Sequence, residues 1–244
     1  MELEGKVAVI TGSSRGIGRA VAERFAAEEA LVVITSRSQA DLDVVAAGIK
    51  SRGGQALAIS ANIDDRVQVE SLFDQVLQAH GRVDVLVNNA GIHRVVPFLE
   101  LTEEEWDRVM QTNLKGTFYC LKAVLPGMVA RGQGVIINVA SVAAKTGGKF
   151  PVHHYVAAKS AIIGLTKSLS SEFAPLGLRV NCVCPGITDT GMAKDIKPHF
   201  EPIIPMRRLG TPEEVAEVIL FLASDRASYI TGEITDVNGG LFMD

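Results

Sequence analysis

The residues most suggestive of chemistry are a tyrosine and a lysine one helical turn apart, Tyr155 and Lys159 in YVAAK. They begin an amphipathic stretch, and positions i and i+4 of a helix share one face. A nearby ammonium favours the phenolate and lowers the pKa of a tyrosine from about 10, so Tyr155 could exchange a proton near neutral pH. Ser141 follows the apolar run VIINVA, at the carboxyl end of a predicted strand. Doubly wound folds bind their ligands at such strand ends.

A glycine-rich turn near the start of the chain is typical of a phosphate site. The predicted strand Lys6–Thr11 runs through Gly12, Gly16 and Gly18 directly into a predicted helix. Their spacing, GxxxGxG, makes the whole motif one residue longer than the GxGxxG fingerprint. Glycines let the backbone approach a ligand closely, and the helix N-terminus favours an anion. We therefore predict a dinucleotide site here rather than a plain tight turn.

Two arginines flank this predicted site without an accompanying acid. NAD binders place a carboxylate at the end of the second strand, whereas NADP binders supply positive charge for a 2′-phosphate. Here the second predicted strand ends in Thr35, Ser36 and Arg37. Arg15, at the start of the first helix, opposes the helix macrodipole unless an anion binds there. The two arginines together favour NADP over NAD.

The composition bounds the class of protein. The 244 residues are 47% hydrophobic and 21% charged, which fits one large globular domain over residues 1–244. The net charge of −4 argues against a nucleic-acid partner. Three cysteines make no disulfide framework and favour a reducing compartment. With no run of about 20 apolar residues and no signal peptide, we expect a cytoplasmic protein with no membrane partner; no metal site is predicted.

Short β-branched runs alternate with longer amphipathic stretches along the whole chain, which is typical of an α/β fold with a doubly wound parallel sheet and helices on both faces. About seven strands are expected, at Lys6–Thr11, Leu31–Ser36, Gln55–Ser60, Val83–Asn88, Val135–Ala140, Leu178–Cys184 and Gly232–Val237. Helices are expected at Gly16–Glu28, Ala40–Arg52, Arg66–His80, Thr102–Arg131, Tyr155–Pro175 and Pro212–Ser224. The long irregular stretch 186–209 suggests a substrate lid, with a simple surface excursion as the alternative.

Taken together, these residues resemble the short-chain dehydrogenase/reductase family, and the resemblance extends from Lys6 to Gly240. TGSSRGIG resembles the TGxxxGxG cofactor turn of the family, and NNAG resembles its fourth-strand motif. The other matching positions are the catalytic tetrad and the sixth-strand motif: Asn113, Ser141, Tyr155 and Lys159, then Pro185 and Gly186. The resemblance implies a Rossmann fold and hydride transfer between a nicotinamide cofactor and a carbonyl or alcohol.

The resemblance also implies a role for each matching polar residue. Tyr155 would protonate the carbonyl oxygen in reduction and act as the base in oxidation. Lys159 would lower the pKa of Tyr155 and hold the nicotinamide ribose. Ser141 would hydrogen-bond the substrate oxygen as charge develops on it. Asn113 would anchor a water that links Lys159 to solvent.

The cofactor site implied by the resemblance draws on several segments. Its residues are Gly12, Ser14, Arg15, Gly16, Ile17, Gly18, Arg37, Asn62, Ile63, Asn89, Ala90, Gly91, Tyr155, Lys159, Pro185, Gly186, Thr188 and Thr190. The family commonly has aspartate at the position of Asn62, where it accepts a hydrogen bond from the adenine amino group. The asparagine oxygen can still accept that bond.

The resemblance is strongest to 3-oxoacyl carrier-protein reductases and related carbonyl reductases. Members that dock an acidic carrier protein often have basic residues near the active-site entrance. Arg131 fits one such position, but Leu176 occupies the place of a second, so an acyl-carrier partner is doubtful. The candidate substrate-pocket residues are His93, Arg94, Phe150, His153, His154 and Met192. We hypothesise that His93, Arg94 and His154 favour an anionic or polar substrate.

Three functions remain open. The first is an NADPH-dependent ketoreductase acting on a 3-oxoacyl thioester or similar small ketone. The second is an alcohol or sugar dehydrogenase that works in the oxidative direction, and the third is a non-catalytic dinucleotide-binding module. The family resemblance further implies a homotetramer, in which helices near 102–131 and 155–175 pair across one interface and the C-terminal strand across another.

Overall fold

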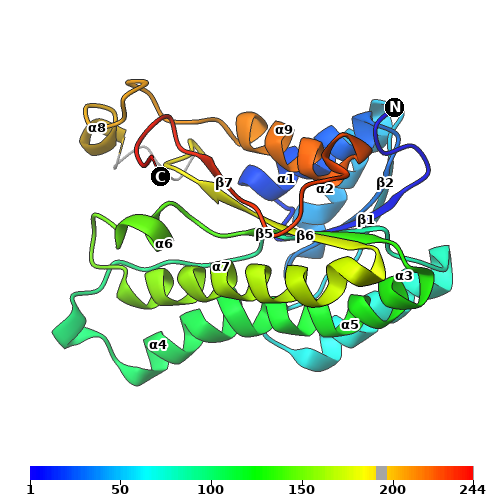
Figure 1. Ribbon diagram of the computed structural model, residues 1–244, viewed down its shortest axis with the longest axis horizontal. Helices are drawn as coiled ribbons and strands as arrows, with labels where there is room; N and C mark the ends of the chain where they lie inside the picture. The colour runs from blue at the N-terminus through cyan, green and yellow to red at the C-terminus, as the bar shows by residue number, and fades with distance from the viewer. Residues whose placement is uncertain (191–196, 244) are drawn as a thin grey trace.

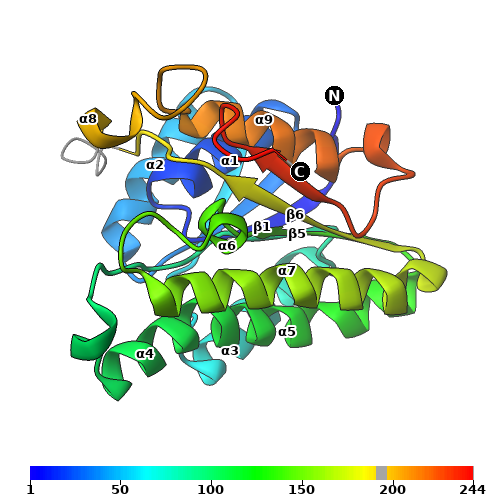
Figure 2. The same cartoon turned by 60° about the vertical axis from the view of Figure 1, so that its left-hand side comes forward.

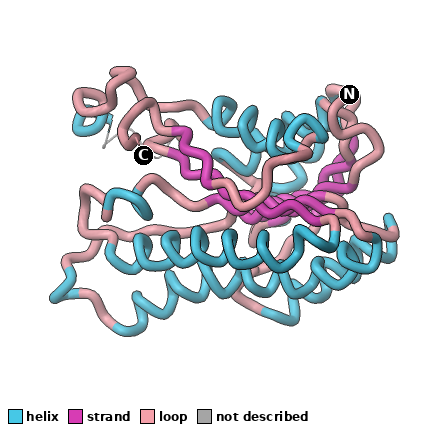
Figure 3. The backbone as a smooth tube through the Cα atoms, viewed as in Figure 1, coloured by secondary structure: helices cyan, strands magenta, loops and turns pink. Residues whose placement is uncertain are grey.

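The computed structural model describes residues 1–190 and 197–243, and within these residues it contains a seven-stranded parallel sheet (Figures 1 and 3). The strand order is β3-β2-β1-β4-β5-β6-β7. Strands β1 to β3 are added toward one edge of the sheet and β4 to β7 toward the other, so the strand order reverses between β1 and β4. Ligands of doubly wound folds bind at this reversal point. The strands are β1 Val7–Thr11, β2 Leu31–Thr35, β3 Gln55–Ala58, β4 Val85–Asn88, β5 Gly134–Val139, β6 Leu178–Pro185 and β7 Ile234–Val237.

Helices cover both faces of the sheet (Figures 1 and 2). On one face lie α1 Gly16–Ala27, α2 Gln39–Ser51 and α9 Pro212–Ala223. On the other lie α3 Arg66–His80, α4 Glu103–Met110, α5 Gly116–Arg131 and α7 His153–Phe173. The two short helices, α6 Ala143–Thr146 and α8 Lys197–Phe200, lie toward the carboxyl ends of the strands. The apolar core is therefore divided into two layers by the sheet, as expected for strands that are buried on both faces.

The predicted fold is confirmed, and one predicted helix is interrupted. All seven strands form at the predicted places. The helix expected over Thr102–Arg131 is broken by a π-helical turn at Gln111–Lys115. Such turns occur mostly at functional sites, and this one contains Asn113. None of the described helices is long and apolar enough to cross a membrane.

Side chains cap the first turns of α2, α3, α4 and α9. Thr211 accepts a hydrogen bond from the Glu214 amide, and the Glu214 carboxylate accepts one from the Thr211 amide, which completes the capping box that the sequence indicates. α7 begins directly after the loop that follows α6. The first turn of α7 contains Tyr155 and the second contains Lys159. Because α7 begins beside the carboxyl ends of the strands, both residues lie at those ends.

Candidate active site

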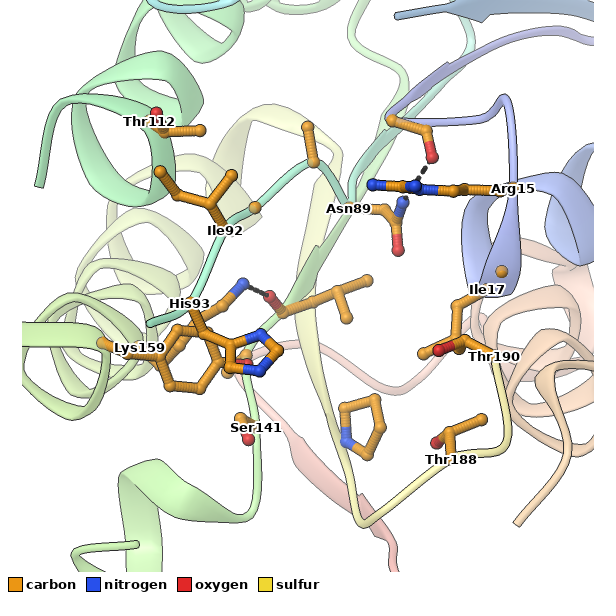
Figure 4. A pocket seen from close by; sticks show the side chains of 18 of the residues that line it. Arg15, Ile17, Asn89, Ile92, His93, Thr112, Ser141, Lys159, Thr188 and Thr190 are labelled. Atoms are coloured by element: carbon orange, nitrogen blue, oxygen red, sulfur yellow. Dashed lines mark hydrogen bonds between the residues drawn. The ribbon is translucent and has the colours of Figure 1, made fainter. Parts of the chain in front are cut away.

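A single large cavity of about 1310 Å³ follows the carboxyl ends of the strands, and it joins the glycine-rich turn to the predicted catalytic residues (Figure 4). A drug-sized ligand usually occupies about 300–1,000 Å³, so this volume suits a dinucleotide together with a small substrate. The predicted residues that line it are Gly12, Ser14, Arg15, Gly16, Ile17, Arg37, Asn62, Ile63, Asn89, Ala90, Gly91, Ser141, Tyr155, Lys159, Pro185, Gly186, Thr188 and Thr190.

The glycine-rich turn needs its glycines for two separate reasons. Gly12 and Gly16 have φ values of 66° and 55°, a region that side chains with a Cβ rarely adopt. A Cβ at Gly12 would also lie 2.8 Å from the Ala90 Cα. At Gly18, which packs behind the turn, a Cβ would lie 2.4 Å from both the Gly12 oxygen and the Asn89 Nδ2. The backbone is therefore packed tightly behind a surface that faces the cavity.

The NNAG segment locks this turn to β4. The Asn89 Nδ2 donates to the Thr11 and Gly12 oxygens at 2.9 and 3.1 Å. The Thr11 hydroxyl accepts from the backbone amides of Asn89 and Ala90 at 3.0 and 3.1 Å. The role of Thr11 was missed from the sequence, although its place at the end of β1 was a signal. These bonds fix the position of the glycine-rich turn relative to the carboxyl end of β4.

The two predicted cofactor arginines line one end of the cavity, and neither makes an ion pair with a described residue. Arg15 extends across the cavity wall above Ile17 in Figure 4. Two carboxylates of the described residues, those of Asp41 and Asp64, also line this end. The Asn62 oxygen accepts a hydrogen bond from the Asp64 amide at 3.3 Å, so its acceptor capacity is already partly used.

Tyr155 and Ser141 meet at the other end of the cavity. Burial raises the pKa of Tyr155 above its ordinary value, and hydrogen bonding with Ser141 acts in the opposite direction. Burial is the largest of these effects, so the Tyr155 pKa is raised rather than lowered as the sequence predicts. The Ser141 hydroxyl oxygen also accepts a hydrogen bond from the Ala143 amide at 3.2 Å, which orients the side chain at the start of the segment leading into α6.

Lys159 and Asn113 meet at the backbone of Gly91. The Lys159 Nζ donates to the Val139 oxygen at 2.6 Å, and burial lowers the pKa of Lys159 to about 8. The Asn113 side chain both donates to and accepts from the Ile92 backbone, each at 2.8 Å. A Cβ at Gly91 would lie 3.2 Å from the Asn113 Oδ1 and 3.5 Å from the Lys159 Nζ. Asn113 itself does not line the cavity, and it acts on the segment that does.

Known proteins are similar to this chain over its whole length. Residues 12–242 match the family model described as enoyl-(acyl carrier protein) reductase. The chain is 41% identical over 247 residues to 3-oxoacyl-[acyl-carrier-protein] reductase FabG of Thermotoga maritima, with 100% of both proteins covered. It is 43% identical over 248 residues to the reductase of the same name from Vibrio cholerae, again with 100% of both covered.

A solved structure extends the similarity to three dimensions. The crystal structure of a 3-oxoacyl-[acyl-carrier protein] reductase from Brucella melitensis is 38% identical and has a TM-score of 0.95, over 100% of this chain and 93% of that chain. The chain belongs to the short-chain dehydrogenase/reductase family. It is therefore an oxidoreductase of a family that uses a nicotinamide cofactor.

In this short-chain dehydrogenase/reductase, the predicted substrate-pocket residues divide into three groups. His93 and Phe150 line the cavity, and the His93 ring stands edge-on to Tyr155 with the ring centroids 5.9 Å apart. Arg94, His153 and His154 are not among the described lining residues. Met192 lies outside the residues that the structure describes.

The three residues outside the lining have other contacts, which the sequence pattern could not indicate. Arg94 pairs with Glu105 at 2.6 Å, and His153 packs edge-on against Phe98. His154 is fully buried, and burial lowers its pKa. The hypothesis that Arg94 and His154 set the charge of the entrance therefore gains no support from the lining, because neither side chain reaches it.

The irregular stretch that we expected to be a lid borders the substrate end of the cavity. Phe200 of α8 and Ile203, which sequence reasoning missed, are part of the lining. Phe200 also packs with Ile204 and Leu209 in a small apolar cluster that includes Phe150. The long connection therefore has an apolar core of its own, which is the physical reason that it can lie against the site.

The expected carrier-docking positions lie far from the cavity of their own chain. Arg131 ends α5 and donates to the Val83 oxygen, just before β4 begins. Leu176 lies just before β6 and is 44% exposed. Both positions are thus at the amino-terminal edge of the sheet, opposite the site. Arg131 is not among the described residues that line the cavity of its own chain.

Proposed function

We propose that this protein is an NADPH-dependent ketoreductase that reduces a 3-oxoacyl thioester, or a similar small ketone, to a secondary alcohol. The proposal is carried by one observation: Ser141, Tyr155 and Lys159 border the same cavity whose other end presents Arg15 and Arg37, neither of which pairs with an acid among the described residues. The names of the similar reductases support the same substrate class.

The residues present fit a bound NADPH. The close backbone approach of Gly12 and Gly18 leaves a smooth surface at the N-terminus of α1 for the pyrophosphate. Arg15 and Arg37 would bind the 2′-phosphate, Asn62 would contact the adenine, and Lys159 would hold the nicotinamide ribose. The segments Asn89–Gly91 and Pro185–Thr190 would enclose the remainder. Bound NADPH would supply a hydride to the carbonyl carbon of the substrate.

The proposed chemistry at the carbonyl oxygen belongs to this chain. Ser141 would donate a hydrogen bond to the oxygen as negative charge develops there. Tyr155 would transfer its hydroxyl proton to the same oxygen, which completes the alcohol and leaves a phenolate. The raised pKa of Tyr155 keeps it protonated at neutral pH, as a proton donor must be.

Lys159 and Asn113 would assist the proton transfer from Tyr155 without themselves donating the proton to the substrate. With a pKa of about 8, Lys159 is mostly charged at pH 7 and would stabilise the Tyr155 phenolate. The phenolate would recover its proton from solvent past Lys159. Asn113 would keep that path open by holding the Ile92 backbone in place and by anchoring a water.

The decisive test is turnover of an acetoacetyl thioester with NADPH and with NADH, followed at the nicotinamide absorbance. Replacing Tyr155 by Phe should lower kcat by about 10²–10⁴-fold, because the general acid is removed. Tyr229→Phe is the matched control, since Tyr229 is fully exposed and outside the cavity. Unchanged turnover in Tyr155→Phe would remove the assignment. Faster oxidation of small alcohols or sugars than reduction of ketones at pH 7 would favour the dehydrogenase alternative.

The partner and location are part of the same proposal. The proposed substrate is the thioester, and an acyl-carrier protein is a doubtful partner, because Leu176 occupies the place of a second basic residue. The protein is proposed to be a cytoplasmic homotetramer. β7 is an edge strand of the described sheet and Phe118 on α5 is 47% exposed, which would suit the two interfaces. A monomeric mass by light scattering would refute the tetramer.

A further inference from the structure

The substrate end of the cavity contains an exposed cation that the proposed chemistry does not use. Lys149 lies in the loop between α6 and α7, and its side chain is exposed and belongs to the cavity lining. It makes no ion pair with a described residue. In this it differs from Arg94, which is near in sequence to the site but is paired with Glu105.

An aromatic ring of the lid stretch holds this ammonium. The Lys149 Nζ lies 5.8 Å from the centroid of the Phe200 ring, within the range of a cation–π contact. Phe200 is itself buried and packs edge-on against Phe150, with the ring centroids 5.5 Å apart. Packing thus fixes the Phe200 ring, and the ring holds the Lys149 ammonium at the cavity wall. No carboxylate of the described residues neutralises this ammonium there.

The charges around the cavity are distributed unevenly. Its two carboxylates among the described residues, Asp41 and Asp64, both lie at the cofactor end. At the substrate end the described lining is apolar or neutral apart from Lys149, the catalytic lysine and His93. A cation with no acid beside it among the described lining residues attracts anions, and the surrounding apolar surface strengthens that attraction.

We propose that Lys149 binds a negatively charged group of the substrate, a carboxylate or a phosphate, while the keto group lies against Tyr155 and Ser141. This inference deepens the proposed function and rests on it. It identifies the substrate class as anionic ketones, either small oxo acids or thioesters with a phosphorylated arm. Lys149 is a specificity-determining residue, because it touches the substrate away from the reacting atoms.

Two matched pairs of ketones show whether Lys149 binds a carboxylate or a phosphate of the substrate. Acetoacetyl-coenzyme A is compared with acetoacetyl-pantetheine, which lacks the phosphates, and acetoacetate is compared with neutral ethyl acetoacetate. Wild-type enzyme should prefer the charged member of one pair, and that pair identifies the anion. Replacing Lys149 by Ala should raise KM for that member about tenfold, the order expected for losing a charged hydrogen-bond partner, and should leave the neutral member within about twofold.

Further variants distinguish charge from shape. Lys149→Arg should retain the preference and Lys149→Glu should reverse it, whereas Lys50→Ala, an exposed lysine on α2 outside the lining, should change nothing. The preference should also weaken at high salt, because the group is exposed. Equal rates for both members of each pair in wild-type enzyme, or equal losses on both in Lys149→Ala, would overturn the inference.

A binding measurement keeps this inference separate from the proposed reaction. Calorimetry on Tyr155→Phe enzyme saturated with NADPH measures affinity for each ketone without turnover. Loss of affinity for the charged member in the double variant Tyr155→Phe, Lys149→Ala supports the inference even if no ketone is reduced, an outcome that would refute the ketoreductase function alone. Equal affinities in the two variants would refute the role of Lys149.

Discussion

The Lys159 ammonium donates a 2.6 Å hydrogen bond to the backbone oxygen of Val139, the last residue of β5. This bond joins α7 to the carboxyl end of the strand that leads to Ser141. The lysine is 4% exposed, and its burial is the cause of its lowered pKa. The charged form of Lys159 therefore destabilises the folded state.

Destabilisation by the buried Lys159 charge should make the stability of the protein depend on pH. Burial lowers the pKa of Lys159 from 10.5 to about 8, so between these values the unfolded chain binds more protons than the folded one. The stability of the wild type should therefore rise relative to that of Lys159→Met as the pH increases from 8 to 10.5, by about 3 kcal/mol in total. Urea unfolding of both proteins at pH 7, 8, 9 and 10 measures the difference. A constant difference over this range would contradict the buried charge.

Cofactor choice should depend on Arg37. Replacing Arg37 by Ala should lower kcat/KM with NADPH about tenfold, because a charge-assisted contact to the 2′-phosphate is lost. The same change should leave kcat/KM with NADH within about twofold. Arg66→Ala, on the exposed start of α3, is the control. Equal losses with both cofactors would place Arg37 elsewhere than at the 2′-phosphate.

Two glycines on helices should respond oppositely to a methyl group. At Gly18 a Cβ would lie 2.4 Å from the Gly12 oxygen, so Gly18→Ala should displace the turn and weaken cofactor binding at least about tenfold. At Gly164 on α7 a Cβ would meet nothing within 4 Å. Gly164→Ala should therefore stabilise the protein by about 0.5–1 kcal/mol through helix propensity. Cofactor titration and thermal unfolding of both variants check the pair, and unchanged cofactor affinity in Gly18→Ala would contradict it.

The buried His154 should make the protein sensitive to acid. Neither of its ring nitrogens has a hydrogen-bond partner among the described residues, and burial lowers its pKa below 6.5. Below pH 6.5 the unfolded chain therefore binds the proton first, and the wild type should lose stability as the pH falls. Replacing His154 by Leu should reduce this loss between pH 7 and 5, because the substituted chain no longer has a group that binds a proton more readily when unfolded. His80→Gln is the control, and an unchanged acid slope in His154→Leu would refute the prediction.

Much of the fold and of the site could be predicted because the signals are local. The TGSSRGIG turn requires glycine at given backbone angles, and the strands are continuous apolar runs of predictable length. Tyr155 and Lys159 lie one turn apart on any helix, so their common face follows from spacing alone. The boundary errors are small for the same reason, except where the π-helical turn around Asn113 interrupts a periodic pattern.

The amino-acid sequence alone determined the doubly wound fold, the family and the position of the predicted catalytic residues, because periodicity and backbone requirements act over a few neighbouring residues. Only the tertiary structure decided which side chains border the cavity. It turns Arg94 toward Glu105 and buries His154, and it brings Lys149 against Phe200. These contacts join different elements of the fold, and packing and charge in three dimensions decide which side chains meet, which no helical or strand periodicity encodes.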